Sequence, residues 1–422
     1  MNGPEDFWAS GPDGRERMTR LGFSTERLAR IDRFLTERYI EPGRIPCAQL
    51  IVARRGEVAH STVLGLRDVE RGLRCEEDTL FRIYSMTKPL TSVALMMLWE
   101  EGAIALDDPV EKHIPEWRDL GVFKAGIVGG FVTDRPARPM QVVDLMRHTS
   151  GLTYGFQSRT NVDAAYRRLK IGDMPGVLTL EETVAALAAL PLEFSPGEAW
   201  NYSISTDIVG YLVGRLSGMP FQDFLRTRIL QPLKMVDTDF QVAPGQEHRL
   251  AACYGVGAQG GLALQEDPQT SPYLKPPVFY SGGGGLVSTA ADYLRFMRML
   301  ANGGVLDGVR LIAPRTLKLM TANHLPGGQD LTNLSRSMFS ESTYAGIGFG
   351  LGFAVVFDAP RTLIPGSNGE YYWGGAASTA FWIDPAEEVM AVLMTQLMPS
   401  SSYPIRRELR TLVYSALVET NG

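Results

Sequence analysis

Cysteine is scarce in this sequence, which limits the covalent links and metal sites it can form. Only three cysteines occur among 422 residues, and Cys47, Cys75 and Cys253 lie far apart with no Cys-x-x-Cys pair. That spacing supports neither a disulfide framework nor a zinc ribbon. The His-Glu-x-x-His, P-loop and EF-hand patterns are missing too, so metalloprotease, nucleotide-phosphate and calcium sites lack their minimum residues. We expect no metal and no cofactor.

Long hydrophobic runs and an excess of basic charge are also missing. The apolar run at residues 93–99 is far shorter than the roughly 20 residues of a membrane-spanning helix. Lysine and arginine number 41 against 47 acidic residues, so the formal net charge is -6. Without a basic face, nucleic acid is not an expected partner. The first 18 residues carry acids and no apolar signal core, so we expect a cytoplasmic protein that does not bind membranes.

Two familiar enzyme signatures are missing or misleading. The chain has only five histidines and no Gly-x-Ser-x-Gly turn, which disfavours an α/β-hydrolase with a Ser-His-Asp triad. Residues 255–260 fit Gly-x-Gly-x-x-Gly, but no amphipathic helix follows whose N-terminus could bind a pyrophosphate. We interpret this segment as a glycine-rich loop.

The composition and the pattern of elements are those of a folded enzyme with two parts. Hydrophobic residues make up 45% and charged residues 21%, and the length predicts two or three units of about 150 residues. Strands and helices gather at both ends, with short helices between them, which predicts an α/β domain of residues 1–106 and 281–422 interrupted by a mainly helical domain of residues 107–280. The expected elements are helices at 24–40, 85–101 and 405–417, a hairpin at 47–65, and strands at 347–357, 370–378, 379–384 and 388–396. The four glycines at 282–285 are expected to form a flexible return between the two parts.

Ser85 and Lys88 form a Ser-x-x-Lys pattern at the start of the clearest predicted helix. Three residues are nearly one helical turn, so the hydroxyl and the amine can face the same side. A nucleophilic serine needs its proton removed, and an amine desolvated by an apolar surface loses its own proton more readily. A helix N-terminus adds N–H groups where an oxyanion would form. As an alternative, serine is a common helix cap and lysine a common first-turn residue.

Two later segments strengthen the catalytic interpretation. Tyr202 follows a Pro-Gly turn in the helical region, and Gly374 and Gly375 lie within a predicted strand. Glycine weakens a strand unless something must approach its backbone closely. Both features fit a substrate carbonyl held between that strand and Ser85.

Four motifs in order along the chain resemble those of the class C β-lactamase superfamily of serine hydrolases. They are Ser85-x-x-Lys88, the Leu-Met-Arg-His-Thr-Ser-Gly-Leu stretch at 145–152, the Pro-Gly-Glu-x-x-x-Tyr-Ser stretch at 196–203, and Trp373-Gly-Gly375. Within the superfamily, the chain is most similar to family VIII carboxylesterases and the related statin-side-chain acyltransferases. The resemblance implies an α+β fold, in which N- and C-terminal helices flank an antiparallel sheet, a mainly helical domain is inserted, and the site lies in the cleft between them.

The resemblance also implies roles for individual residues. Ser85 becomes the acylated nucleophile, and Lys88 and Tyr202 become the coupled general base and acid. The backbone N–H groups of Ser85 and Ala376 become the oxyanion hole. His148 has a functional interpretation as a general base, but the family uses this loop structurally.

Two departures from the β-lactamase pattern point to the kind of substrate. Trp373 stands where β-lactamases have a lysine, and Ile204 stands where they have an asparagine. Both changes remove polar groups from the expected substrate-binding residues, which are Trp373, Gly374, Gly375 and Ile204. Uncharged esters are therefore expected to fit better than penicillins, with slow cephalosporin hydrolysis.

The resulting hypothesis is a serine carboxylesterase that acts on short- to medium-chain esters, with a small-molecule ester as its only expected partner. An acyltransferase on the same scaffold is the first alternative, and a β-lactamase or D-amino-acid peptidase the second. A non-catalytic binding relative of penicillin-binding proteins is disfavoured because Ser85, Lys88 and Tyr202 are all present. The natural ester and the oligomeric state stay open.

Overall fold

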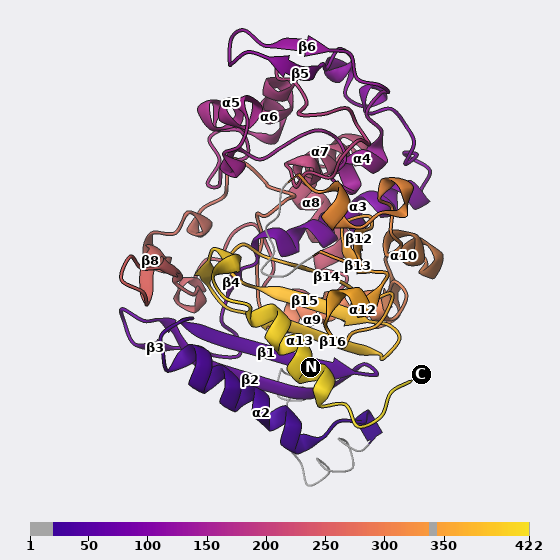
Figure 1. Cartoon of the computed structure of the whole chain (residues 1–422). Helices are drawn as coiled ribbons and strands as arrows, with labels where there is room; N and C mark the ends of the chain where they lie inside the picture. Colours follow the sequence, from indigo (N-terminus) through magenta and orange to yellow (C-terminus); the bar gives the residue numbers. More distant parts are fainter. Residues whose placement is uncertain (1–19, 337–343, 422) are drawn as a thin grey trace.

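An eight-stranded antiparallel sheet forms the centre of the molecule in the computed structural model, which describes residues 20–336 and 344–421 (Figure 1). The strand order β12-β13-β14-β15-β16-β1-β2-β3 places the first strands of the chain beside the last ones. The predicted hairpin and C-terminal strands are therefore present in one sheet, as the α+β expectation requires. Their bounds are Cys47–Arg54 (β1), Glu57–Asp68 (β2), Leu73–Arg74 (β3), Ile347–Phe349 (β12), Ala354–Val356 (β13), Tyr371–Gly374 (β14), Ala380–Asp384 (β15) and Val389–Met394 (β16).

Strand β1 is buried along its whole length because helices cover both faces of the sheet. Alternate β1 side chains enter two different cores, since successive residues of a strand point to opposite faces. Helices α2 (Thr25–Leu35) and α13 (Ile405–Ser415) pack together over one face, and α9 (Ala290–Ala301) packs on β1 and β16 over the other. Ser24 caps α2 by accepting a hydrogen bond from the Arg27 N–H, as its position in the sequence predicts.

Helix α3 (Thr87–Glu100) is the predicted helix after Ser85, but it is not amphipathic. Residues 87–98 are buried on every side of the helix, because α7 (Ser205–Ser217) and α8 (Phe221–Leu225) pack against it as well as the sheet domain. A helix that is buried all round is typical of a protein interior. The helix that follows Ser85 is thus held rigidly at the centre of the molecule.

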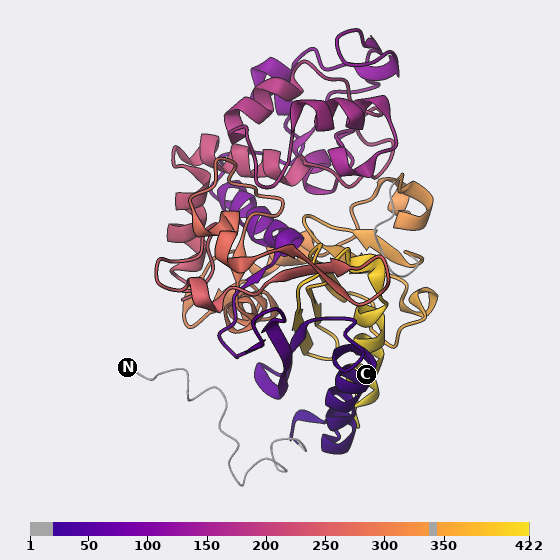
Figure 2. The ribbon, with the colours of Figure 1, turned by 90° about the vertical axis from the view of Figure 1, so that its left-hand side faces the viewer.

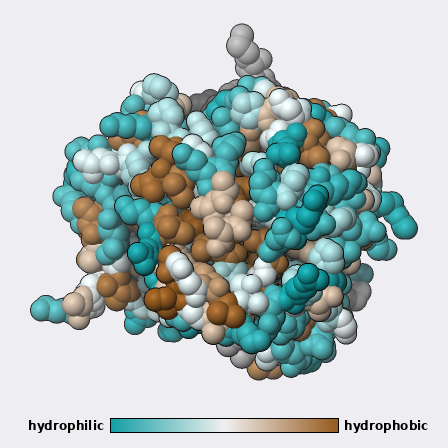
Figure 3. All heavy atoms as spheres, turned by 90° about the horizontal axis from the view of Figure 1, so that it is seen from above, coloured by the Kyte–Doolittle hydropathy of each residue, from teal (hydrophilic) through white to brown (hydrophobic). Residues whose placement is uncertain are grey.

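The central third of the chain forms a mainly helical region above the sheet, seen from the side in Figure 2. It contains α4 (Val142–Met146), α5 (Asn161–Leu169), α6 (Leu180–Leu187), α7 and α8, together with a small hairpin of β5 (Val122–Ala125) and β6 (Val132–Asp134). Seen from above, apolar side chains gather near the middle of the view among hydrophilic ones (Figure 3). The exposed apolar residues of this region include Ile127, Val132, Phe156, Leu169, Met174 and Val177.

The glycine-rich segment 255–260 joins β7 (Cys253–Val256) to β8 (Leu262–Glu266). This confirms the interpretation of a loop, because an antiparallel strand and not a helix follows it. Strand β17 (Leu397–Met398) pairs with β7 in parallel, so the two parts of the chain also meet here. The division at residues 106 and 280 stays a prediction.

Two sequence expectations need correction at finer scale. Residues 347–357 form two strands and not one, because the chain reverses direction between Phe349 and Ala354. The last helix ends at Ser415, two residues before the expected Leu417. Within residues 20–336 and 344–421, no helix combines the length and the apolar character that crossing a bilayer demands.

Candidate active site

Ser85 lies in a sharp turn that joins strand β4 (Phe81–Arg82) to helix α3. The preceding residue, Tyr84, has a φ of 42°, a left-handed conformation that is rare for a large side chain. Such strain persists only where the surrounding structure holds it, and it gathers at functional sites. Here it turns the chain so that Ser85 lines the main cavity just before the buried helix begins.

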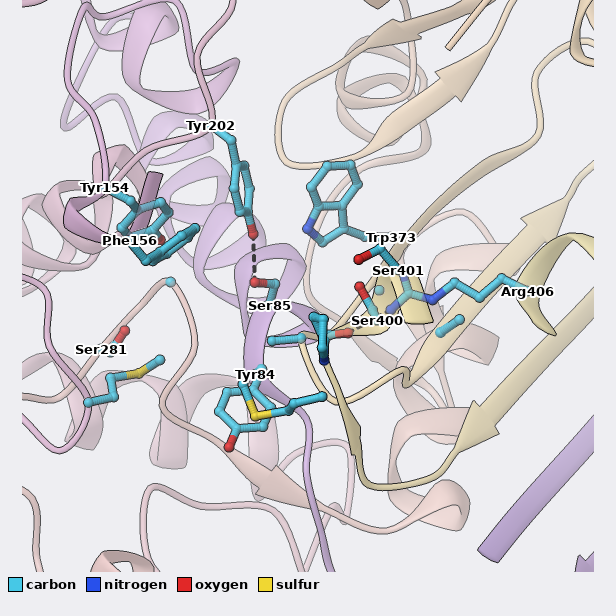
Figure 4. A pocket seen from close by; sticks show the side chains of 18 of the residues that line it. Tyr84, Ser85, Tyr154, Phe156, Tyr202, Ser281, Trp373, Ser400, Ser401 and Arg406 are labelled. Atoms are coloured by element: carbon cyan, nitrogen blue, oxygen red, sulfur yellow. Dashed lines mark hydrogen bonds between the residues drawn. The ribbon is translucent and has the colours of Figure 1, made fainter. Parts of the chain in front are cut away.

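Two side chains meet the Ser85 hydroxyl (Figure 4). The Tyr202 hydroxyl donates a hydrogen bond of 2.6 Å to Ser85 Oγ, and Lys88 Nζ lies 3.2 Å from the same atom. Tyr202 comes from the loop before α7 and is 117 residues from Ser85 in the chain. The structure therefore brings together the three residues for which the sequence predicts a catalytic role.

Lys88 is 1% exposed and is surrounded by groups that suit a positive charge. Its Nζ donates to the Gly283 carbonyl at 2.7 Å and to the Tyr154 hydroxyl at 3.2 Å. The same atom lies 4.4 Å from the centre of the Tyr202 ring, within the range of a cation–π contact. Buried polar groups need such partners, and these contacts hold Lys88 Nζ beside Ser85 and Tyr202.

Asp207, at the start of α7, is fully buried on the far side of this network. It accepts hydrogen bonds from Ser281 Oγ at 2.5 Å and from the Gly283 N–H at 2.9 Å. Burial raises the pKa of Asp207, and the positive charge of Lys88 acts in the opposite direction. Burial, and next the charge of Asp207, raise the pKa of Tyr154 well above its ordinary value. Tyr154 therefore stays a neutral hydroxyl beside Lys88.

The tetraglycine segment does not form the flexible return that the sequence predicts. All four glycines are buried, and a Cβ on Gly283 would lie 2.6 Å from Asp207 Oδ2 and 2.8 Å from the Tyr154 hydroxyl. A Cβ on Gly282 would lie 2.8 Å from the Thr206 carbonyl. The glycines allow this backbone to press against α7 and to present the Gly283 carbonyl to Lys88.

The second of the two glycines, Gly375, packs closely against the segment that leads to Ser85. Strand β14 ends at Gly374, and a Cβ on Gly375 would lie only 2.4 Å from the Ile83 carbonyl oxygen. The segment that carries Ser85 thus approaches this backbone closely, as does the side chain of Thr379. Both Ser85 and Ala376 line the cavity. Neither the Ser85 N–H nor the Ala376 N–H donates a hydrogen bond to another of the described residues, so both are available to an oxyanion.

Ser85 opens into a cavity of about 780 Å³, within the usual range for small-molecule sites. Trp373, Gly374 and Gly375 line it as predicted, and Trp373 packs on Tyr202 with ring centres 5.5 Å apart. Ile204 does not line the cavity. Its side chain is fully buried and lies next to Gly172, which does line the cavity. Among the aromatic residues near the motifs, Tyr154, Phe156 and Tyr372 line the cavity.

His148 is a structural neighbour of the site. Its ring is 1% exposed and packs on Tyr202 at 5.0 Å between ring centres, and its Nδ1 lies 3.2 Å from Ser203 Oγ. Burial, with a smaller contribution from the charge of Lys88, holds the pKa of His148 well below 6.5. It is therefore a neutral ring that supports Tyr202.

This burial makes a prediction about stability. Below about pH 6.5 an unfolded histidine takes up a proton that the folded His148 does not, so the free energy of unfolding falls as the pH falls. In urea denaturation, the stability of the wild type minus that of His148→Asn is expected to be constant above pH 7 and to shrink by about 1.4 kcal/mol for each pH unit below 6.5. A difference that is the same at pH 5.5 and pH 7.5 would show that His148 can be protonated in the folded state.

Sequence reasoning missed three contributors to the site. Sequence patterns assign no role to Asp207, predict Gly283 only as part of a flexible return, and predict no contact between Tyr154 and Lys88. Their signals in the sequence are weak, because a single acid at a helix start and a run of glycines have many ordinary explanations. In residues 20–336 and 344–421, no group of three or more His, Cys, Asp or Glu side chains is arranged to hold a metal ion.

Comparison with known proteins identifies the family of the chain. The sequence profile named "Beta-lactamase" matches residues 32–415. "Protein Rv1367c" of Mycobacterium tuberculosis is 36% identical over 86% of this chain and 88% of its own length, and "Esterase EstB" of Burkholderia gladioli is 30% identical over 88% and 91%. The solved structure of "EstCE1, a hydrolase with promiscuous acyltransferase activity" superposes with a TM-score of 0.77 at 26% identity, over 93% of this chain and 99% of that one. The chain therefore belongs to the β-lactamase family, and within it resembles the family VIII esterases.

Proposed function

We propose that the protein is a serine carboxylesterase that hydrolyses short- to medium-chain esters through an acyl-enzyme on Ser85. The observation that carries this proposal is the Ser85 hydroxyl itself, which lies 2.6 Å from the Tyr202 oxygen and 3.2 Å from Lys88 Nζ at the wall of a large cavity. A nucleophile within hydrogen-bond reach of its base is the arrangement that acyl transfer needs. The relationship to EstB and EstCE1 supports the ester as substrate class.

In the reactive form, Lys88 is the ammonium and Tyr202 the phenolate. As Ser85 Oγ attacks the ester carbonyl carbon, its proton moves to the Tyr202 oxygen, and the N–H groups of Ser85 and Ala376 receive the oxyanion. Tyr202 then returns the proton to the leaving alcohol oxygen as the C–O bond breaks, which leaves Ser85 acylated. Water repeats the sequence: it gives a proton to Tyr202, attacks the acyl carbon and releases the acid, and the proton returns to Ser85.

Esters are expected to react faster than penicillins because the cavity lacks the lysine with which β-lactamases meet a substrate carboxylate. Trp373 occupies that position, and the loss of a charged hydrogen bond costs roughly 10-fold or more in rate. Initial rates with p-nitrophenyl butyrate and benzylpenicillin test this expectation on the purified chain. Faster turnover of benzylpenicillin would contradict the esterase proposal in favour of a β-lactamase.

An acyltransferase is the second candidate, because the acyl-enzyme is the same and only the acceptor differs. The cavity volume leaves room for an alcohol beside a short acyl group, and EstCE1 is described as having promiscuous acyltransferase activity. Adding a primary alcohol to the ester assay and measuring both the new ester and the free acid separates transfer from hydrolysis.

A further inference from the structure

Arg406 on helix α13 lies against the strand end that leads to Ala376. Its Nη2 donates to the Gly375 carbonyl oxygen at 2.6 Å and to the Thr379 carbonyl oxygen at 2.8 Å. Figure 4 shows the side chain extending from its helix toward the segment of Trp373, beside Ser401. The guanidinium is therefore fixed to two main-chain carbonyls at the edge of the cavity.

The strand is shaped to receive this guanidinium. A Cβ on Gly374 would lie 2.6 Å from Arg406 Cζ, 2.7 Å from its Nη2 and 2.8 Å from the Thr379 carbonyl oxygen. Glycine at 374 therefore leaves room both for the guanidinium and for the main chain of Thr379. At Gly375 the close neighbours of a Cβ would be Thr379 Oγ1 and the Ile83 carbonyl oxygen.

The carbonyl that Arg406 holds belongs to the same peptide group as the Ala376 N–H. The Gly375–Ala376 peptide bond is trans, since it is not among the cis bonds of the described chain. In a planar trans peptide the C=O and the N–H point in opposite directions. Fixing the Gly375 oxygen on the α13 side therefore directs the Ala376 N–H away from α13.

The hydrogen bond from Arg406 also makes the Ala376 N–H a stronger donor. A hydrogen bond from a cation is shorter and stronger than one between neutral groups, and it polarises the peptide so that the N–H at its other end donates more strongly. The Ser378 N–H also donates to the Gly375 oxygen, at 3.2 Å. Within the turn, the Ser378 N–H thus gives the Gly375 oxygen a weaker hydrogen bond between neutral groups. Arg406 adds a charge-assisted hydrogen bond to the same oxygen.

We propose that Arg406 is a positioning residue for the oxyanion hole, which holds and polarises the Gly375–Ala376 peptide so that the Ala376 N–H stabilises the tetrahedral intermediate. This inference rests on the proposed function, because it needs an acyl transfer at Ser85. It adds to the reaction a residue of the C-terminal helix that acts through the Gly375–Ala376 peptide.

Arg406→Gln and Arg406→Lys test the role with p-nitrophenyl butyrate and an alkyl trifluoromethyl ketone. The ketone forms a hemiketal with a nucleophilic serine and places its oxyanion where the intermediate does. For Arg406→Gln we expect kcat to fall about 10-fold with KM within twofold, and the inhibition constant of the ketone to rise by the same factor. This is less than the roughly 10²- to 10³-fold loss on removal of an oxyanion donor itself. Arg406→Lys should lose less, because it keeps the charge but not the planar fork.

Arg27→Gln is the matched control, because Arg27 also donates to a main-chain carbonyl of α13, that of Ser415, but lies exposed on α2. It should leave kcat, KM and the inhibition constant of the ketone unchanged. Two results would overturn the role of Arg406. One is an equal loss of kcat in Arg406→Gln and Arg27→Gln. The other is a fall in kcat in both Arg406 variants without weaker binding of the ketone. Thermal unfolding shows which variants are folded. If Arg406→Gln does not fold, Arg406→Lys provides the test.

Labelling with a fluorophosphonate separates this proposal from the proposed function. A wild-type chain that neither hydrolyses the ester nor takes up the label contradicts the esterase itself. A wild-type chain that does both, with Arg406 variants that match it in kcat and ketone affinity, contradicts only the positioning role.

Discussion

Replacing Ser85 with alanine is expected to abolish the hydrolysis of p-nitrophenyl esters, with a loss of roughly 10⁴-fold or more in kcat. The substitution removes the oxygen that lies within hydrogen-bond distance of both the Tyr202 hydroxyl and Lys88 Nζ, so no acyl-enzyme is expected to form. The side chain is small and half-buried at the cavity wall, and the fold should therefore be retained. Steady-state rates and the burst of p-nitrophenol measure the loss.

The covalent intermediate gives a second readout for the same variant. A fluorophosphonate should add one phosphonyl group to the wild type by mass spectrometry, and none to Ser85→Ala. Ser61→Ala is a suitable control, because Ser61 lies on strand β2 and does not line the cavity. Ester hydrolysis that survives in Ser85→Ala would place the nucleophile elsewhere.

Replacing Tyr202 with phenylalanine is expected to lower kcat by about 10²- to 10⁴-fold, the range of a lost general acid or base. The change removes one oxygen and keeps the ring, which packs against His148, Trp373 and the Lys88 ammonium. Stability should change little, and KM should stay close to that of the wild type because binding contacts remain.

Tyr211→Phe provides the matched control for this substitution, since Tyr211 lies on α7 outside the cavity and its hydroxyl accepts a bond from Arg215. Comparing kcat, KM and the thermal midpoint of both variants separates a chemical role from a packing role. A Tyr202→Phe chain with nearly full kcat would leave Lys88 as the base, because it is the other group that contacts Ser85 Oγ.

The periodic elements could be predicted because they depend on local patterns. Alternation and turn residues predict the hairpin of β1 and β2, and a serine cap predicts the start of α2. Helix α3 shows the limit of this reasoning. Its apolar stripe is visible in the sequence, but only packing from both sides reveals that the polar positions between are buried as well.

The candidate site also has one part that the sequence predicts and another that it does not. Ser85 and Lys88 are three residues apart, and helical geometry alone predicts that they meet. Tyr202, Trp373 and Ala376 came from an ordered set of motifs, and the structure brings them to one cavity. Ile204 came from the same motif as Tyr202 but points into the core behind Gly172, because adjacent residues of a loop can face opposite ways.

By itself, the sequence determined the α+β class, the Ser-x-x-Lys spacing that brings Ser85 and Lys88 together, and the absence of the residues for common metal and phosphate sites. The tertiary structure alone decided that the Gly283 carbonyl and Tyr154 hold Lys88, that Asp207 lies behind them, and that Arg406 holds the peptide of Ala376. The physical reason is that these contacts join segments far apart in the chain. Their energies depend on distance and burial in space, which the spacing of residues along the sequence does not contain.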